Sequence, residues 1–143
     1  MSVELPFAPV DEIIRREAGT LRVSADATEE LSEWIQDRGA ALAVDAAERT
    51  TTDGRKTIMA GDFGVDSAPP PDATTLPIAP VDRIARLDLD DRFRVGEQAR
   101  VVLAHHLEEE AAEAAAGAAK LARHAGRRTV QAEDFETYFE LVE

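Results

Sequence analysis

The sequence predicts an all-α chain in which two similar helical units pack against each other. Three observations carry this prediction: a duplicated set of sequence blocks, one long amphipathic segment in each copy, and a proline-rich stretch between the copies. The chain has 143 residues, 44% of them apolar, and no cysteine. That length suits one compact domain, and the lack of cysteine excludes disulfide scaffolds, thiol nucleophiles and Cys-ligated metals.

The duplication is visible as four blocks that recur in the same order. The first block, LPFAPVD at 5–11, reappears as LPIAPVD at 76–82. The other three recur at one common spacing, which is a single residue longer: RV (22–23) as RV (94–95), GRKTI (54–58) as GRRTV (126–130), and AGDF (60–63) as AEDF (132–135). Four blocks at nearly one spacing indicate a tandem duplication.

The stretch between the copies is SAPPPDATT, residues 67–75. Its three consecutive prolines cannot continue a helix and favour an extended path, so we expect a linker. The expected organisation is therefore a first unit at 1–66, the linker at 67–75 and a second unit at 76–143.

Each copy is expected to hold a short helix, a long helix and a last helix. In copy 1 we expect a short helix after Pro9, a long helix from Ser24 to about Thr52 that ends before Gly54, an extended piece at 56–58 and a last helix from Ala60. In copy 2 we expect a short helix after Pro80, a long helix from about Glu97 to His124 that ends before Gly126, an extended piece at 128–130 and a last helix from Ala132. A helix of about 28 residues is a rod of roughly 42 Å. Such a rod is too long to be covered within one unit, so we expect the two rods to pack on each other.

The charge of the chain is unusual in kind as well as in sum. The formal net charge is −13, and 14 of the 16 basic residues are arginines. An acidic total disfavours binding to nucleic acid, because phosphate contacts need cations. Scarce lysine, abundant carboxylates and 26 alanines are also typical of proteins from cells that accumulate salt, where the Debye length falls to about 3 Å. The alternative is an acidic protein of ordinary salinity that avoids anions.

Two segments of copy 2 closely resemble the archaeal histones. They are LPIAPVDRI at 76–84 and KLARHAGRRTVQAEDF at 120–135, and copy 1 carries the same opening with a looser GRKTIMAGDF at 54–63. With the acidic, lysine-poor composition, the chain looks like the haloarchaeal type with two fused histone folds. The resemblance implies an all-α tandem histone fold, in which two helix–strand–helix–strand–helix units form an intramolecular handshake pseudo-dimer.

The resemblance also implies non-sequence-specific contact with the backbone of double-stranded DNA through paired loops and first helices. The residues that match the family's DNA-contacting positions, or lie beside them, are Arg15, Arg22, Lys56, Thr57, Arg83, Arg86, Arg94, Arg128 and Thr129. In a handshake, Arg22 should meet Arg128 and Thr129, while Arg94 should meet Lys56 and Thr57. Copy 1 departs from the family because Glu12 stands where copy 2 has Arg83.

Two further roles follow from the same resemblance. Arg55 with Asp62, and Arg127 with Asp134, match the family's structural ion pair within one copy. Leu121, His124 and Asp134 match the residues that join two dimers, whereas copy 1 has Arg49 and Thr52 at the first two positions. We therefore expect self-association through the second repeat only, giving closed dimers of this chain.

The resulting expectation is a DNA-binding histone that organises chromatin, acts as a global transcription regulator, or does both, in the nucleoid of a high-salt cytoplasm. The alternative is an acidic histone-fold interaction module with weak or no DNA binding. Local positive patches at the paired loops would favour the first, and loops neutralised by carboxylates would favour the second. No catalytic set, metal site, cofactor or small-molecule substrate is expected. No apolar run approaches the roughly 18 residues that a membrane span needs, and the start lacks a signal-like segment, so no membrane association is expected.

Overall fold

The computed structural model describes residues 3–142. In chain order its elements are α1 (Phe7–Ala18), β1 (Arg22–Val23), α2 (Ala25–Thr52), β2 (Thr57–Ile58), the 3-10 turn η1 (Ala60–Phe63), a second 3-10 turn η2 (Pro71–Ala73), α3 (Ile78–Arg86), β3 (Arg94–Val95), α4 (Glu97–His124), β4 (Thr129–Val130) and α5 (Ala132–Val142). The chain is therefore mostly helical, as predicted. The second unit has the expected helix–strand–helix–strand–helix order, whereas the last helix expected from Ala60 in the first unit is only the 3-10 turn η1.

The ends of the long helices follow from local sequence. The Ser24 hydroxyl accepts a hydrogen bond of 3.1 Å from the backbone N–H of Ala27, which satisfies one free donor at the start of α2. Just after α2 and α4, Gly54 and Gly126 adopt φ values of 72° and 74°. Glycine reaches this left-handed conformation without steric cost, so both rods stop at corresponding points of the two copies.

The short helices begin earlier than expected. Pro6 and Pro77 occupy the N-cap positions of α1 and α3, so Pro9 and Pro80 lie inside the first helical turn instead of before it. The N–H groups of the first turn have no partner within the helix, so a proline there removes no hydrogen bond.

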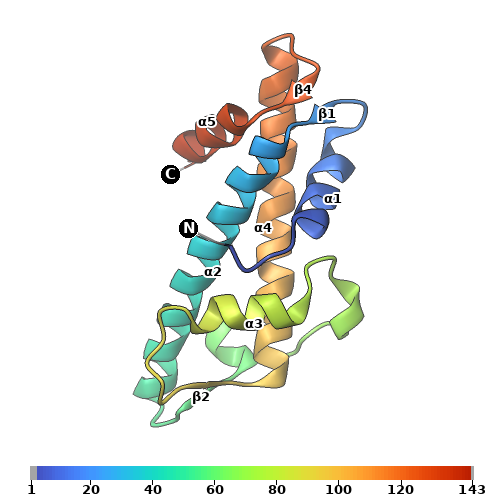
Figure 1. The fold of residues 1–143 in the computed structure, drawn as a ribbon. Coiled ribbons are helices and arrows are strands. Elements are labelled where there is room, and N and C mark those ends of the chain that lie inside the picture. Colours follow the sequence, from blue (N-terminus) through green and yellow to red (C-terminus); the bar gives the residue numbers. More distant parts are fainter. Residues whose placement is uncertain (1–2, 143) are drawn as a thin grey trace.

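The two copies are interlocked in a handshake. The rods α2 and α4 cross each other in the middle of the molecule (Figure 1). The first helix of each copy packs most extensively on the rod of the other copy, α1 on α4 and α3 on α2. Neither copy therefore has a complete core of its own, in agreement with the sequence argument that each rod needs the other.

The core is built from small residues on the rods and branched residues on the first helices. Alanines such as Ala43 and Ala115 are fully buried, and Ile13, Ile14 and Ile84 fill the space beside them. At Gly39 an added Cβ would lie 2.7 Å from Cγ2 of Ile84. The alanine-rich composition thus allows close helix approach as well as high helix propensity.

The strands pair in parallel between copies at opposite ends of the molecule. β1 pairs with β4, with Arg22 opposite Thr129, and β2 pairs with β3, with Thr57 opposite Arg94. Figure 1 shows the β1–β4 pair at the upper end of the rods and β2 at the lower end. Each end of the molecule therefore carries one loop from each copy.

The last helices differ between the copies. In copy 2, α5 spans 11 residues and packs on both rods, with Phe135 fully buried. In copy 1 the corresponding element is η1, four residues long, and it stops at Gly64, whose φ is 87°. Among residues 3–142 no helix is long and apolar enough to span a membrane.

Candidate nucleic-acid interface

Each end of the molecule presents loop cations on a short, rigid strand pair. At the β1–β4 end the N–H of Arg22 donates to the carbonyl oxygen of Arg128 at 2.8 Å. At the β2–β3 end the N–H of Arg94 donates to the carbonyl oxygen of Lys56 at 2.9 Å. The four cationic side chains are exposed, while Thr57 and Thr129 are half-buried beside them. The structure thus brings together the residues that the sequence analysis assigned to the paired loops.

The loop cations have no carboxylate within ion-pair distance among residues 3–142. Within residues 3–142, Arg22, Lys56, Arg94 and Arg128 form no ion pair. Two further arginines stand near these ends without an ion pair in the same region. Arg123 donates to the carbonyl oxygen of Ala18 at 3.0 Å, and Arg92 lies 4.8 Å from the ring centre of Phe93. Both ends therefore present cationic side chains outside any ion pair in the described residues, although Asp90 and Asp91 adjoin Arg92 and the chain as a whole is acidic.

Arg92 and Arg123 were not predicted as interface residues because neither belongs to a repeated block. Copy 1 has Thr20 and Thr51 at the corresponding positions, so comparing the two copies gives no signal there. The one available hint was position: Arg123 is in the last turn of α4, where a cation also favours the helix C-terminus.

A buried ion pair braces each loop from within its own copy. Arg55 binds Asp62 with an Nη2–Oδ1 distance of 2.7 Å, and Arg127 binds Asp134 in the same bidentate way. The aspartates are 4% and 2% exposed. Each aspartate also accepts a backbone hydrogen bond of 2.8 Å at the start of the last element, from Met59 or Gln131. A bidentate pair with this support fixes the loop rather than offering a charge to a ligand.

The electrostatics of the copy 1 pair agree with a structural role. The Arg55 guanidinium, with further hydrogen bonds from the Met59 N–H and the Thr50 hydroxyl, holds the pKa of Asp62 at about 2. The pKa of Arg55 is raised in turn by its hydrogen bonds to Asp62 and Asp53. In copy 2 the carboxylate of Asp134 raises the pKa of Arg127. The copy 1 loop therefore stays braced by a charged pair at neutral pH.

The arginines of the first helices are engaged with acidic neighbours. Arg15 pairs with Asp11 at 2.7 Å and Arg86 with Asp82 at 3.1 Å, each one helical turn away. Arg83 reaches across to Glu4 of the other copy at 2.9 Å. Phosphate would have to compete with these carboxylates, so Arg15, Arg83 and Arg86 are less available to an anion than the loop cations. Glu12 is exposed on α1, and its nearest cation is Arg16 at 3.5 Å.

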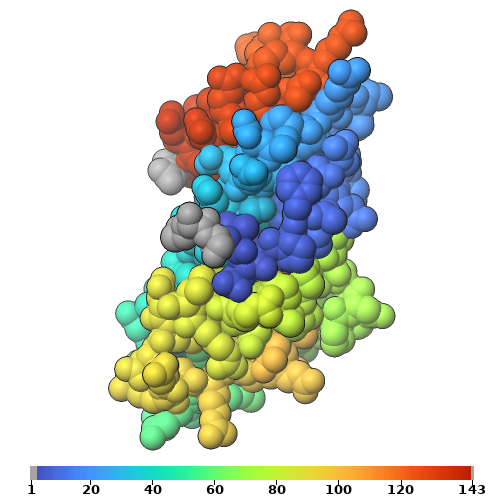
Figure 2. Space-filling view, in the orientation of Figure 1, coloured from blue at the N-terminus to red at the C-terminus, as the bar shows by residue number. Residues whose placement is uncertain are grey.

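One face of the molecule joins the two ends. Figure 2 shows α1, in blue, beside α3, in yellow-green, with the β1–β4 end above them and the β2–β3 end below. Loops and first helices therefore share one surface, and the loop cations lie at its two extremes.

The residues expected to mediate self-association have different surroundings. His124 is exposed and Leu121 is half-buried at the end of α4. Asp134 is buried, and both of its oxygens bind Arg127. In the described part of the chain no cluster of three or more His, Cys, Asp or Glu side chains could hold a metal ion.

Two interlocked helix–strand–helix units with parallel loop pairs at both ends define a histone fold, closed here within a single chain. The family model described as histone-like transcription factor (CBF/NF-Y) and archaeal histone matches residues 3–64 and again 74–137. The chain belongs to this family of DNA-binding histone-fold proteins, which package DNA and are not enzymes.

The chain is also similar to individual proteins of known function or structure. It is 52% identical over 59 residues to the archaeal histone HAN1 of Thermococcus zilligii, across 41% of this chain and 85% of that protein. The histone of Methanopyrus kandleri superposes with a TM-score of 0.67 at 24% identity, covering 94% of this chain and 92% of its own. A Thermus thermophilus protein gives a TM-score of 0.74 at 18% identity, covering 98% and 97%. At these identities the two solved structures establish the shared fold alone.

Proposed function

We propose that this chain binds duplex DNA without sequence specificity, through the phosphate backbone, and so organises chromatin or regulates transcription broadly. The observation that carries the proposal is the set of exposed loop cations, Arg22 with Arg128 and Arg94 with Lys56, that lack carboxylate partners in the described chain. Guanidinium and ammonium groups bind phosphate oxygens, and nearby hydroxyl and backbone N–H groups can add hydrogen bonds.

We propose further that this DNA binding is weak and takes place in the nucleoid of a high-salt cytoplasm, as in the haloarchaeal type with two fused folds. The net charge of −13 repels a polyanion when salt does not screen it. The arginines of the first helices already have carboxylate partners, and Glu12 replaces one cation of the surface that joins the two ends. DNA contact is therefore concentrated at the two loop ends.

The ion-paired first helices favour a second candidate function. If Arg15, Arg83 and Arg86 keep their carboxylate partners in the presence of DNA, the surface between the loop ends offers no attraction to phosphate. The chain would then act as an acidic histone-fold module that mainly associates with proteins, with weak or no DNA contact.

A titration of DNA binding against salt distinguishes the two functions. Mobility shift and nuclease footprinting of random-sequence duplex DNA are run from roughly 0.2 to 4 M KCl. Regular protection over tens of base pairs, with affinity falling as salt rises, is the result expected of a backbone-binding histone. Absence of a shift and of protection at every salt concentration would reject DNA binding and leave the interaction module.

We also propose that two chains associate through copy 2 and form a closed particle of four histone folds. Leu121 and His124 are at least partly accessible at the end of α4, beside the complete helix α5. At the corresponding end of copy 1, Arg49 donates to the backbone carbonyl of Asp62, and η1 provides only one turn. One end of each chain therefore has a surface for pairing and the other end lacks it.

The expected size of this assembly is testable by sedimentation. In multi-molar KCl the chain should reach a two-chain particle and no larger, and Leu121→Glu with His124→Glu should reduce it to a single chain. Glutamates at the corresponding positions of copy 1, as Arg49→Glu with Thr52→Glu, should leave the two-chain particle intact, although they lower the net charge by three units rather than two. Long oligomers that grow with protein concentration would contradict the closed particle.

A further inference from the structure

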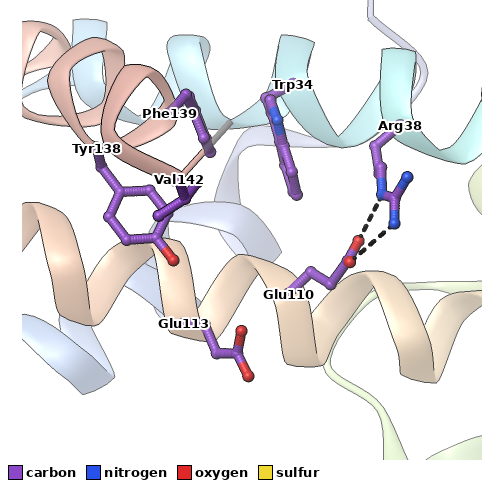
Figure 3. Close-up of a pocket in the computed structure, with 7 residues that line it drawn as sticks. All are labelled: Trp34, Arg38, Glu110, Glu113, Tyr138, Phe139 and Val142. Atoms are coloured by element: carbon purple, nitrogen blue, oxygen red, sulfur yellow. Dashed lines mark hydrogen bonds and ion pairs between the residues drawn. The ribbon is translucent and has the colours of Figure 1, made fainter.

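The crossing of the two rods is held by an ion pair between corresponding residues of the two copies. Arg38 of α2 and Glu110 of α4 are 72 residues apart, the same spacing that separates the duplicated blocks around both rods. Arg38 binds Glu110 through two hydrogen bonds, Nε to Oε1 at 2.8 Å and Nη2 to Oε2 at 3.0 Å (Figure 3). In a two-fold arrangement, corresponding residues meet only beside the axis, so this pair marks the pseudo-two-fold axis of the handshake.

Because the two residues correspond, this contact depends on which copies are paired. Copy 1 paired with copy 2 gives Arg38 against Glu110. Copy 1 paired with copy 1 of another chain would place Arg38 against a second Arg38, and copy 2 paired with copy 2 would place two Glu110 carboxylates together. Arg38 is 39% and Glu110 27% exposed, so the charges are only partly screened by water. Like-charge contacts at this point destabilise both like pairings.

A second contact between the copies has the same asymmetry. Arg83 of α3 binds Glu4 of copy 1 at 2.9 Å. When LPFAPVD of copy 1 is aligned with LPIAPVD of copy 2, Glu12 corresponds to Arg83 and Glu4 corresponds to Thr75. Two copies of type 1 would therefore oppose Glu12 and Glu4, and two copies of type 2 would leave Arg83 against the uncharged Thr75. The attractive pair again exists only between unlike copies.

We propose that the pairs Arg38–Glu110 and Arg83–Glu4 direct each histone fold to the unlike copy and reject the like copy of another chain. The Arg38–Glu110 contact is separate from DNA binding, since it lies at the crossing of the rods rather than at the loop ends, whereas Arg83 is also one of the predicted DNA contacts. The selection of the unlike copy also keeps the two ends of each handshake different. A pairing of like copies would give a handshake with either two α5 helices or two η1 turns.

The charges of each like pairing can be built into the single chain. Glu110→Arg creates the arginine–arginine contact of two copies of type 1, and Arg38→Glu creates the contact of two copies of type 2. Both variants should lower Tm by about 3–6 °C in fixed KCl, because a bidentate attraction becomes a repulsion. The exchanged variant R38E/E110R restores opposite charges and should recover to within about 2 °C of the original chain. If the two side chains were needed only for packing, the Tm losses of the single variants would instead add in the exchanged variant.

Three further variants sharpen the comparison. Glu109→Arg makes the same charge change on the preceding residue of α4 and should lower Tm less than Glu110→Arg does. Glu110→Gln removes the attraction without adding repulsion, so its Tm should lie between those of the original chain and Glu110→Arg. Arg83→Glu should lower Tm by a smaller amount, since Arg83 is 55% exposed, and should add to the loss in Glu110→Arg. An exchanged variant as unstable as the single variants, or single variants within about 1 °C of the original chain, would overturn the proposal.

Discussion

Replacing Arg22 and Arg94 together with alanine is expected to weaken binding to duplex DNA by about ten- to a hundredfold, uniformly across sequences. Each arginine is exposed, sits on a strand pair and has no carboxylate partner in the described chain, so each can bind a phosphate without giving up another contact. A charge-assisted hydrogen bond contributes about 1.5–3 kcal/mol of binding free energy, and competition with water and salt reduces this contribution. Loss of two phosphate contacts should also reduce the slope of log affinity against log salt by about 2. Fluorescence anisotropy with two unrelated duplexes, over a range of KCl, measures both quantities.

The matched control for this variant is the replacement of Arg15 and Arg86 with alanine. It removes the same number of charges, one from each copy, but from arginines that are paired with Asp11 and Asp82. Binding should fall by less than about threefold, since those arginines must exchange a carboxylate for a phosphate. Equal losses in the two variants would mean that DNA responds to total charge rather than to the loop ends, and would contradict the proposed interface.

Much of this architecture could be predicted from the sequence because the repeat itself carries tertiary information. A constant offset between the two copies, with rods too long to be covered within one unit, predicts that the rods pack on each other, and the resemblance to archaeal histones implies the handshake. Once the handshake is assumed, Arg22 must lie near Thr129 and Arg94 near Thr57, which is the register of the strands. The ends of the rods were predictable for a local reason: Ser24 caps α2, and Gly54 and Gly126 provide the left-handed residues that follow the last turns.

The partners of individual side chains could not be predicted in the same way. Arg83 and Glu4 are 79 residues apart, and they meet because the segment that precedes α1 runs beside α3 (Figure 1). The crossing point of the rods depends on how closely the helices pack, which is set by residues such as Gly39 of α2 against Leu107 of α4. The ion pairs of Arg15 and Arg86 with carboxylates one helical turn away are local, so the i,i+4 spacing of these charges was enough to predict them. Its consequence for DNA binding became evident only beside the unpaired loop arginines.

The unequal last elements of the two copies lead to the largest expected effect on stability. Replacing Phe135 with alanine should lower the free energy of unfolding by about 3–5 kcal/mol. Phe135 is fully buried and anchors α5 to both rods, with Phe139 stacked beside it on Trp34 at 4.7 Å. Removal of the ring leaves a cavity where helices of both copies meet, and the close packing of alanines on the rods leaves few side chains able to move into it.

Phe63 is the corresponding residue of copy 1 and provides the control. It is half-buried within the four-residue turn η1, so Phe63→Ala should cost only about 1–2 kcal/mol. Urea unfolding of both variants at one fixed KCl concentration gives the two free energies directly. Because the two positions share the same place in the repeat, a difference between them measures how far the second copy has become the structural anchor of the chain. Equal losses would show instead that η1 stabilises its end of the rods as strongly as α5 stabilises the other.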